Sequence, residues 1–216
     1  NCKPCSIMSG LGGAGAFSGG KYNITNDFGE SLHEHIGRQQ ALDLMKYVDT
    51  INMTHGGEGA RLFSTAQTKY KKICMQNGLK LLDASVRHLG TDLNHVVLEN
   101  LYKELESCVD FYFDTPVQSI AGDEGGYRIF TKDEEYHCAK CIISVGRSGS
   151  KWMEKICEEM NIKTMSNRVD IGVRVELPAV IFSHLTDELY ESKIVYRTKQ
   201  FEDSVRTFCM NPNGIV

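Results

Sequence analysis

Two polar clusters in the sequence carry residue types that can do chemistry. Lys21 follows a glycine-rich stretch, where its ammonium could stabilise a nearby negative charge. Arg87 and His88 follow a predicted strand; a guanidinium can bind a carboxylate, and an imidazole can transfer protons near neutral pH. Asp92, four residues further on, has a simpler interpretation, because a carboxylate favours the positive end of the helix that we predict next. These clusters are the first candidates for a functional site.

The glycine-rich stretch SGLGGAGAFSGGKYN (9–23) contains Gly10, Gly12 and Gly15 in the order G-x-G-x-x-G. That pattern grips a dinucleotide only where a strand turns into a helix. Here NCKPCSIM precedes it in place of an apolar strand, and two more glycines interrupt any helix after it. The pattern therefore predicts no Rossmann turn. Bare backbone can still approach an anion or a flat ring, so two interpretations stay open: a flexible loop and a ligand-facing loop.

Eight cysteines are scattered through the chain. The pairs Cys2/Cys5 and Cys138/Cys141 resemble halves of a zinc site, but they are too far apart in sequence for a zinc ribbon. We therefore predict no metal site and interpret the cysteines as reduced thiols in a cytoplasmic protein. Cys209 follows an apolar run; a thiol there could relay electrons, but we interpret it as a buried, small apolar residue.

Composition excludes several classes of protein. The chain has 216 residues, a net charge of −4 and no block of basic residues, which argues against nucleic-acid binding. No run of about 18 apolar residues predicts a membrane span. The sequence leaves the oligomeric state open. Because it begins at Asn1 and ends on NPNGIV, we expect it to be the middle of a longer protein.

The periodicity of apolar residues predicts a mixed α/β fold. Cys141–Gly146 (CIISVG) is predicted as a buried parallel strand that runs into a ligand crevice. GDEGG (122–126) is predicted as a hairpin loop. The predicted helices are 32–53, 66–75, 91–108 and 151–160. The predicted strands are 79–86, 109–115, 116–122, 126–132, 134–146, 168–178, 193–198 and 204–210.

Five segments, taken in order, resemble one known family. They are GLGGAGAFSGGKYN (10–23), RHLGTD (87–92), CAKCIISVGRSGS (138–150), DIGVRVELP (170–178) and RTFCMNPNGIV (206–216). The order is similar to that of the uncharacterised FAD-dependent dehydrogenases, two-domain flavoproteins with the patterns GFGGAG-FSDGK, RHIGTD, A-x-G-x-S, GVRVEHP and FCMCPGG. The resemblance covers essentially the whole chain, although the family's strand–GxGxxG–helix unit has no counterpart in it.

The resemblance implies a fold: part of an FAD/NAD(P)-binding Rossmann-like fold with an inserted substrate-type domain. The expected parts are a cofactor-facing loop at 1–23, the helical part of the substrate-type domain at 24–110, a β-meander and closing strand of the FAD-binding fold at 111–164, and the strand-rich part of the substrate-type domain at 165–216. It also implies FAD as cofactor, NAD(P) as a candidate electron partner and a small organic substrate. We expect the chain alone to be inactive.

The resemblance also implies roles for individual residues. Arg87, His88 and Lys21 become the expected catalytic residues, with the ammonium of Lys21 beside the N1–C2=O region of the flavin. The expected cofactor-binding residues are Gly12, Gly13, Gly15, Ser18, Lys21, Val117, Gly146, Asn213 and Gly214.

The chain departs from the family pattern at several positions of these motifs. Gly19 replaces an Asp, Leu177 replaces a His, Asn211 replaces a Cys and Asn213 replaces a Gly. The missing Cys puts a redox-active cysteine pair in doubt, and the four changes together suggest a different substrate.

Two hypotheses from other classes stay open beside the flavoenzyme. One is a non-catalytic module that binds a ligand or a protein through the glycine-rich loop, and the other is a zinc-binding domain. Flavin colour in the intact protein separates the first from the flavoenzyme, and metal analysis tests the second.

Overall fold

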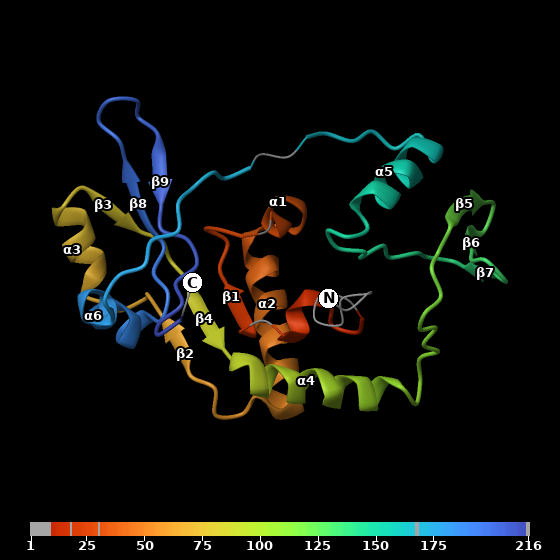
Figure 1. The fold of residues 1–216 in the computed structure, drawn as a ribbon, viewed down its shortest axis with the longest axis horizontal. Helices are drawn as coiled ribbons and strands as arrows, with labels where there is room; N and C mark the ends of the chain where they lie inside the picture. The colour runs from red at the N-terminus through yellow and green to blue at the C-terminus, as the bar shows by residue number, and fades with distance from the viewer. Residues whose placement is uncertain (1–9, 18, 30, 167–168, 215–216) are drawn as a thin grey trace. The chain divides into compact units, whose positions relative to one another are not determined.

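A computed structural model describes residues 10–17, 19–29, 31–166 and 169–214 (Figure 1). The chain divides into two compact units. The first consists of residues 1–105 and 174–216, and the second of residues 106–173. Each unit is described by itself.

The first unit contains a three-stranded antiparallel sheet at its centre, in the order β1-β4-β2. Its strands are β1 (Lys21–Ile24), β4 (Ser85–His88) and β2 (Leu62–Ser64). In β4 Val86 is buried, and alternate residues of a strand point to opposite faces. His88 therefore shares a face with Val86, whereas Arg87 points to the other face.

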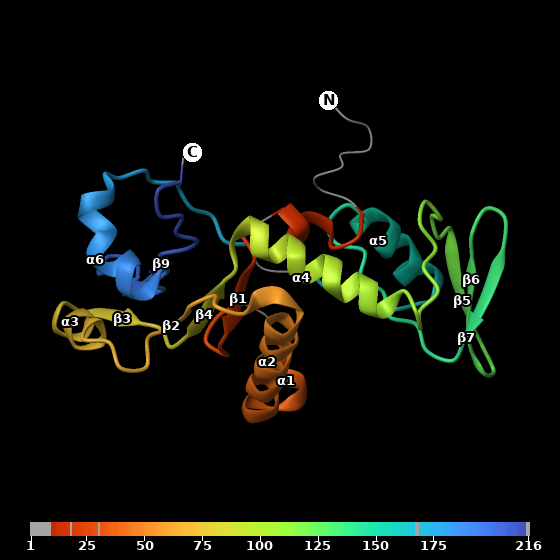
Figure 2. The same ribbon diagram turned by 90° about the horizontal axis from the view of Figure 1, so that it is seen from below.

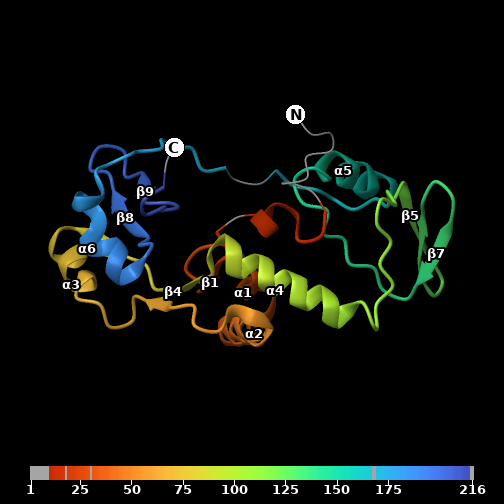
Figure 3. The same cartoon turned by 60° about the horizontal axis from the view of Figure 1, so that its bottom comes forward.

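One long helix packs against β1 of this sheet, and a second follows β4 and packs against the end of the first (Figures 2 and 3). The helix predicted over 32–53 forms as α1 (Leu32–Ile36) and α2 (Arg38–Asn52), because Gly37 between them has a φ of 85° that no helix allows. A π-helical turn, Met53–Gly57, extends α2 and meets α4 (Gly90–Leu105), where the Asn100 side chain donates to the His55 carbonyl at 2.8 Å. The helix predicted at 91–108 is thus confirmed over most of its length.

A second antiparallel sheet of the same unit has the order β3-β8-β9. Its strands are β3 (Leu79–Leu81), β8 (Ile194–Arg197) and β9 (Ser204–Arg206), and α3 (Tyr70–Gln76) and α6 (Ala179–Leu189) flank it. Tyr70, Cys74, Leu81 and Leu189 form a buried apolar cluster between these elements.

The strand predicted over 79–86 is divided between the two sheets. Leu79–Leu81 pairs with β8, whereas Ser85–His88 pairs with β1 and β2, so the chain crosses from one sheet to the other at residues 82–84. At the crossing the Leu82 amide donates to the Lys193 carbonyl at 2.9 Å. One continuous apolar run therefore serves two sheets.

The prediction of a strand over 168–178 is wrong for the described residues 169–178, which form no strand, and α6 follows directly without having been predicted. Five apolar side chains at alternate positions of this segment are strongly exposed, and Ile171 is 96% exposed. They are Val169, Ile171, Val173, Val175 and Leu177. The alternation is typical of a strand, but within the described residues no neighbouring strand satisfies it.

The second unit contains a three-stranded antiparallel meander and one helix. Its elements are β5 (Ser119–Asp123), β6 (Gly126–Phe130), β7 (Glu135–Cys138) and α5 (Ser150–Glu159). The hairpin predicted at 122–126 is confirmed, since Asp123 pairs with Gly126. Ile120 of β5 and Ile156 of α5 are buried, and the Trp152 indole donates to the Gln118 carbonyl at 3.2 Å.

Two further strand predictions in this unit are wrong. Residues 109–115 form no strand, and Cys141–Gly146 is not the buried parallel strand that its composition suggested, since Ile142 is 93% exposed. A parallel strand forms only by pairing with a neighbouring strand, and none of the described strands pairs with this segment.

The structure confirms a mixed α/β fold, and all the strand pairings of the described residues are antiparallel. It corrects the expectation that CIISVG (141–146) supplies a parallel strand. Among the helices described, none is both long and apolar enough to cross a membrane.

Candidate functional site

Lys21 and His88 lie opposite each other in the first sheet. Lys21 of β1 pairs directly with His88 of β4, so their side chains share one face. Phe63 of β2, which pairs with Val86, lies on this face too. The sequence separates Lys21 and His88 by more than sixty residues, and antiparallel pairing makes them neighbours.

The chain immediately after α6 covers this face. Tyr190 has φ 57° and ψ −60°, and the Glu191 amide donates to the Leu189 carbonyl at 2.6 Å. This is a γ-turn of the positive-φ form, which is rare and strained for a side-chain-bearing residue. The turn places the Tyr190 hydroxyl 2.8 Å from His88 Nε2, and the two rings stack with centroids 4.2 Å apart.

Glu191, the next residue, is a buried carboxylate between two ammonium groups. Its side chain is 1% exposed, with Lys21 at Oε2 and Lys193 at Oε1. Lys193 is itself buried and lies over the rings of Phe28 and Phe208, at 5.4 Å and 4.8 Å from their centroids. We call Lys21, Glu191 and Lys193 the lysine–glutamate cluster.

Cys209 joins the edge of the cluster. Its Sγ lies 3.7 Å from Lys21 Nζ, and the residue is exposed. The interpretation of Cys209 as a buried apolar residue is therefore wrong: it follows β9 in an irregular segment whose Phe208 is also exposed.

The glycine-rich segment forms a turn and a short 3-10 helix, η1 (Gly13–Phe17). Asn94 of α4, which is 2% exposed, anchors it: its Nδ2 donates to the Gly15 carbonyl at 2.7 Å, and its Oδ1 accepts from the Tyr22 hydroxyl at 3.1 Å. Gly12 packs against Leu98, where a Cβ would lie 2.9 Å from a side-chain methyl.

Gly13 and Gly15 differ from Gly12, because a Cβ on either would meet no atom within 4 Å. Gly13 has a φ of 53°, which explains its glycine, but Gly15 does not have a positive φ. Among the described residues, neither side-chain packing nor a positive φ requires glycine at position 15. A ligand that approaches the bare backbone would provide the reason.

Gly19 adjoins the imidazole. A Cβ on Gly19 would lie 2.8 Å from His88 Nε2, the atom that faces Tyr190. Glycine at this position leaves room for the contact between His88 and Tyr190.

Arg87 points to the opposite face and has partners within the fold. Its guanidinium binds Asp49 of α2 through Nε at 2.6 Å and Nη2 at 2.8 Å, and Nη1 donates to the Ala60 carbonyl at 2.6 Å. Both side chains are largely buried. The structure thus does not bring Arg87 together with Lys21 and His88.

The remaining predicted site residues are spread along the chain. Ser18 lies outside the described residues. Asn213, with a φ of 60°, and Gly214 belong to the first unit, where they form a turn closed by a bond from the Gly214 amide to the Asn211 carbonyl. Val117 and Gly146 belong to the second unit.

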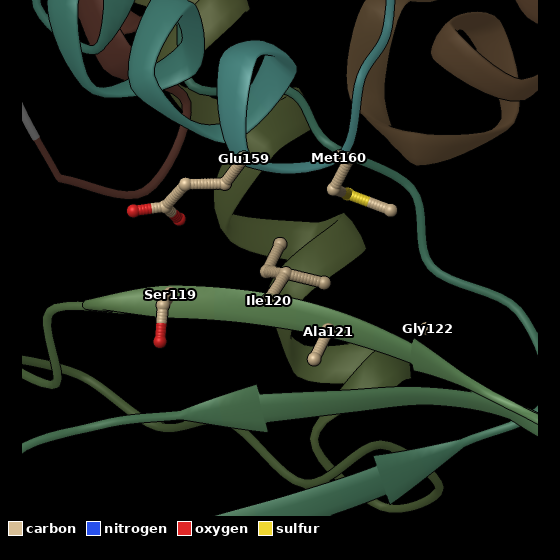
Figure 4. A pocket seen from close by; sticks show the side chains of 6 residues that line it. All are labelled: Ser119, Ile120, Ala121, Gly122, Glu159 and Met160. Carbon is tan, nitrogen blue, oxygen red and sulfur yellow. The ribbon is translucent and has the colours of Figure 1, made fainter.

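The second unit has an open pocket of its own (Figure 4). Figure 4 shows Glu159 and Met160, at the end of α5, over the strand β5. The pocket has a volume of about 570 Å³, and Ser119, Ile120, Ala121 and Gly122 line its other side. Val117 lies two residues before this strand.

Sequence reasoning missed Asn94, Tyr190, Glu191 and Lys193. Glu and Lys are almost never buried, so YESK (190–193) gives no sign that its charges lie inside the protein. Only the pairing of β8 with β3 and the turn at Tyr190 place them there.

The environment of His88 sets its protonation. Burial lowers its pKa, the charge of Lys21 lowers it further, and Glu191 acts in the opposite direction. Burial also raises the pKa of the Tyr190 hydroxyl. At neutral pH His88 is therefore neutral and able to accept a proton.

We expect stability to depend on pH through His88. Because its folded-state pKa lies below the ordinary 6.5, the unfolded chain binds a proton first as the pH falls. The free energy of unfolding should decrease as the pH drops below about 6.5. Urea denaturation at several pH values checks this, and His88→Gln, which can still hydrogen-bond Tyr190, should show a smaller decrease. An equal decrease in both proteins would contradict the assignment.

Metal ligation finds no support in the described part of the chain, where no three His, Cys, Asp or Glu side chains group closely enough to hold an ion. Cys2 and Cys5 lie outside the described residues.

Comparison with known proteins gives one match that is informative about length. An uncharacterized protein of Clostridium beijerinckii (strain ATCC 51743 / NCIMB 8052) is 24% identical over 222 residues, which cover 98% of this chain and 35% of that protein. The chain thus spans about a third of the length of the relative it matches. No family model matches the chain, and no solved structure matches it.

Proposed function

We propose that this chain is part of an FAD-dependent oxidoreductase that acts on a small organic substrate. One observation carries the proposal: three of the five family-like segments meet at one place. Lys21, His88 and Cys209 come from the first, second and fifth segments. Lys21 lies across from His88 in the sheet, contacts the buried Glu191 and lies 3.7 Å from the Cys209 Sγ. The convergence of three family-like segments on one group of polar side chains is what supports a common site.

The described residues fit a flavin on one side of the site. A Cβ on Gly13 or Gly15 would meet no described atom within 4 Å, so a flat ring can approach the chain closely at both positions. The flavin, when bound, supplies the hydride chemistry. His88 is neutral and held by Tyr190, so it can take a proton from a substrate group next to it. NAD(P) remains the candidate electron partner.

The finer fold proposal is that the second unit belongs to a Rossmann-like FAD-binding domain. Its support is CIISV (141–145), an apolar segment of strand-like composition that pairs with no strand among the described residues. In the intact protein this segment would pair with strands from elsewhere in a longer chain. Val117 and Gly146 would then face the adenine and the cofactor.

Substitution of Gly15 tests the proposal. We expect Gly15→Val to weaken FAD binding by the intact protein about tenfold, because the added side chain covers backbone that the ring approaches. Quenching of flavin fluorescence during titration with FAD measures the affinity. Thermal stability should change little, since a Cβ at Gly15 meets no atom within 4 Å.

Gly125→Val provides the matched control. Gly125 also lacks a positive φ, and a Cβ on it would meet only the Asp123 carboxylate, at 4.0 Å, but it lies in the turn between β5 and β6. FAD affinity should stay unchanged in this variant. If Gly15→Val bound FAD as tightly as the control, the glycine-rich segment would not contact the flavin.

A further inference from the structure

The lysine–glutamate cluster holds an excess of positive charge. Lys21 and Lys193 both pair with Glu191, and within the described residues neither has a second acidic partner. The three side chains carry a net charge of +1, with Glu191 1% and Lys193 6% exposed. An uncompensated charge beside such buried side chains is only partly solvated, which favours binding of an anion.

The two lysines differ in their surroundings. Lys193 faces the rings of Phe28 and Phe208, which attract its ammonium. Lys21 lies over no aromatic ring of the described residues, keeps 21% of its side chain exposed and borders the exposed Cys209. An incoming ligand therefore reaches the excess charge at Lys21.

We infer that Lys21 binds the carboxylate of a small, singly charged organic acid. That this acid is the substrate rests on the proposed function; that Lys21 binds a carboxylate does not. A carboxylate carries one negative charge and balances the cluster, whereas a phosphate carries about 1.5 to 2 near neutral pH and exceeds it. Lys21 thereby takes the role that sequence alone suggested for Arg87, whose guanidinium is already held by Asp49.

The neighbouring polar groups suit the rest of such a ligand. His88 lies directly across from Lys21 in the sheet, and the Tyr190 hydroxyl lies 2.8 Å from its Nε2. Both groups are uncharged near neutral pH, since the pKa of His88 is lowered and that of Tyr190 is raised. They can hydrogen-bond a polar group next to the carboxylate of the ligand, and neither carries a charge that would compete with Lys21 for that carboxylate.

Glu191 is a positioning residue in this arrangement. It touches Lys21 rather than the ligand, and the strained turn at Tyr190 directs its side chain inward. Its carboxylate fixes the ammonium of Lys21 while neutralising only half of the positive charge of the cluster.

Thermal denaturation of the purified chain in acetate tests the inference, with chloride at the same ionic strength as reference. Acetate should raise the melting temperature more than chloride does. Lys21→Gln should weaken the acetate affinity derived from these shifts about tenfold, the usual cost of a lost charge-assisted hydrogen bond. Lys80→Gln, an exposed lysine on β3, should respond to acetate like the unchanged protein.

Glu191→Gln gives a result that a purely structural ion pair would not produce. In chloride the variant should melt at a lower temperature than the unchanged protein. Acetate should raise the melting temperature of the variant by more than it raises that of the unchanged protein. If the variant does not fold, the comparison between Lys21→Gln and Lys80→Gln still decides. An acetate effect that is equal in those two variants overturns the inference.

Two other outcomes separate this inference from the proposed function. In the first, phosphate raises the melting temperature more than acetate does, and Lys21→Gln abolishes this difference. The ligand of Lys21 would then be a phosphate group, and the inference would be overturned. Alternatively, Lys21→Gln could leave the acetate effect intact but abolish FAD binding by the intact protein. That result would mean that Lys21 contacts the flavin and not the carboxylate of the substrate. The inference would then fail while the flavoenzyme proposal stands.

Discussion

Arg87→Ala should lower the free energy of unfolding of the first unit by about 3 kcal/mol. The substitution removes two aligned bonds to Asp49 and one to the Ala60 carbonyl. Asp49 would be left as a nearly buried carboxylate without its cation, at 12% side-chain exposure. Urea denaturation followed by circular dichroism measures the change.

Lys103→Ala is the control for Arg87→Ala. Lys103 pairs with Glu99 one turn away on α4, and both side chains are about half exposed. Its removal should cost less than about 0.5 kcal/mol. A loss of under about 1 kcal/mol in Arg87→Ala would mean that Asp49 does not need the guanidinium. Arg87 would then be available for a ligand, as the family resemblance suggested.

Asn94→Leu should be the second most damaging substitution, at about 2 to 3 kcal/mol. Leucine is similar in size but offers neither a donor to the Gly15 carbonyl nor an acceptor to the Tyr22 hydroxyl. Asn94 also fills the space beside Gly20, since a Cβ added to Gly20 would lie 2.7 Å from the Cβ of Asn94. The same urea experiment measures the loss, and FAD affinity of the intact protein should fall with it.

Asn77→Leu distinguishes a buried from an exposed amide. Asn77 ends α3 and donates to the Ile73 carbonyl at 2.9 Å, but it is exposed. Water can replace this bond, so the loss should stay below about 1 kcal/mol. Equal losses in the two variants would contradict the view that Asn94 ties the glycine-rich segment to α4.

Much of the secondary structure could be predicted from local patterns. The apolar spacing of 91–108 predicted α4, and GDEGG (122–126) predicted the hairpin between β5 and β6. Predictions failed where an apolar run depends on distant partners. Cys141–Gly146 and 168–178 have the composition of strands, but pairing decides whether a strand forms, and no described strand lies beside either segment.

Only some residues of the candidate site could be predicted from the sequence. Lys21 and His88 stand out by residue type, and the sheet register brings them together. Glu191 and Lys193 do not stand out, since their burial depends on the turn at Tyr190 and on β8. The partner of Arg87 could not be predicted either, because its position in a strand shows neither which face its side chain occupies nor that Asp49 lies on that face.

The claim that the protein is a flavoenzyme is tested most directly by its absorption spectrum. The intact protein, purified without added cofactor, should show the visible bands of bound flavin, and acid denaturation should release FAD from it. The 216-residue chain, prepared in the same way, should show none. An intact protein that is colourless and stays so after incubation with FAD and removal of the excess would contradict the account, leaving a non-catalytic ligand-binding module in its place.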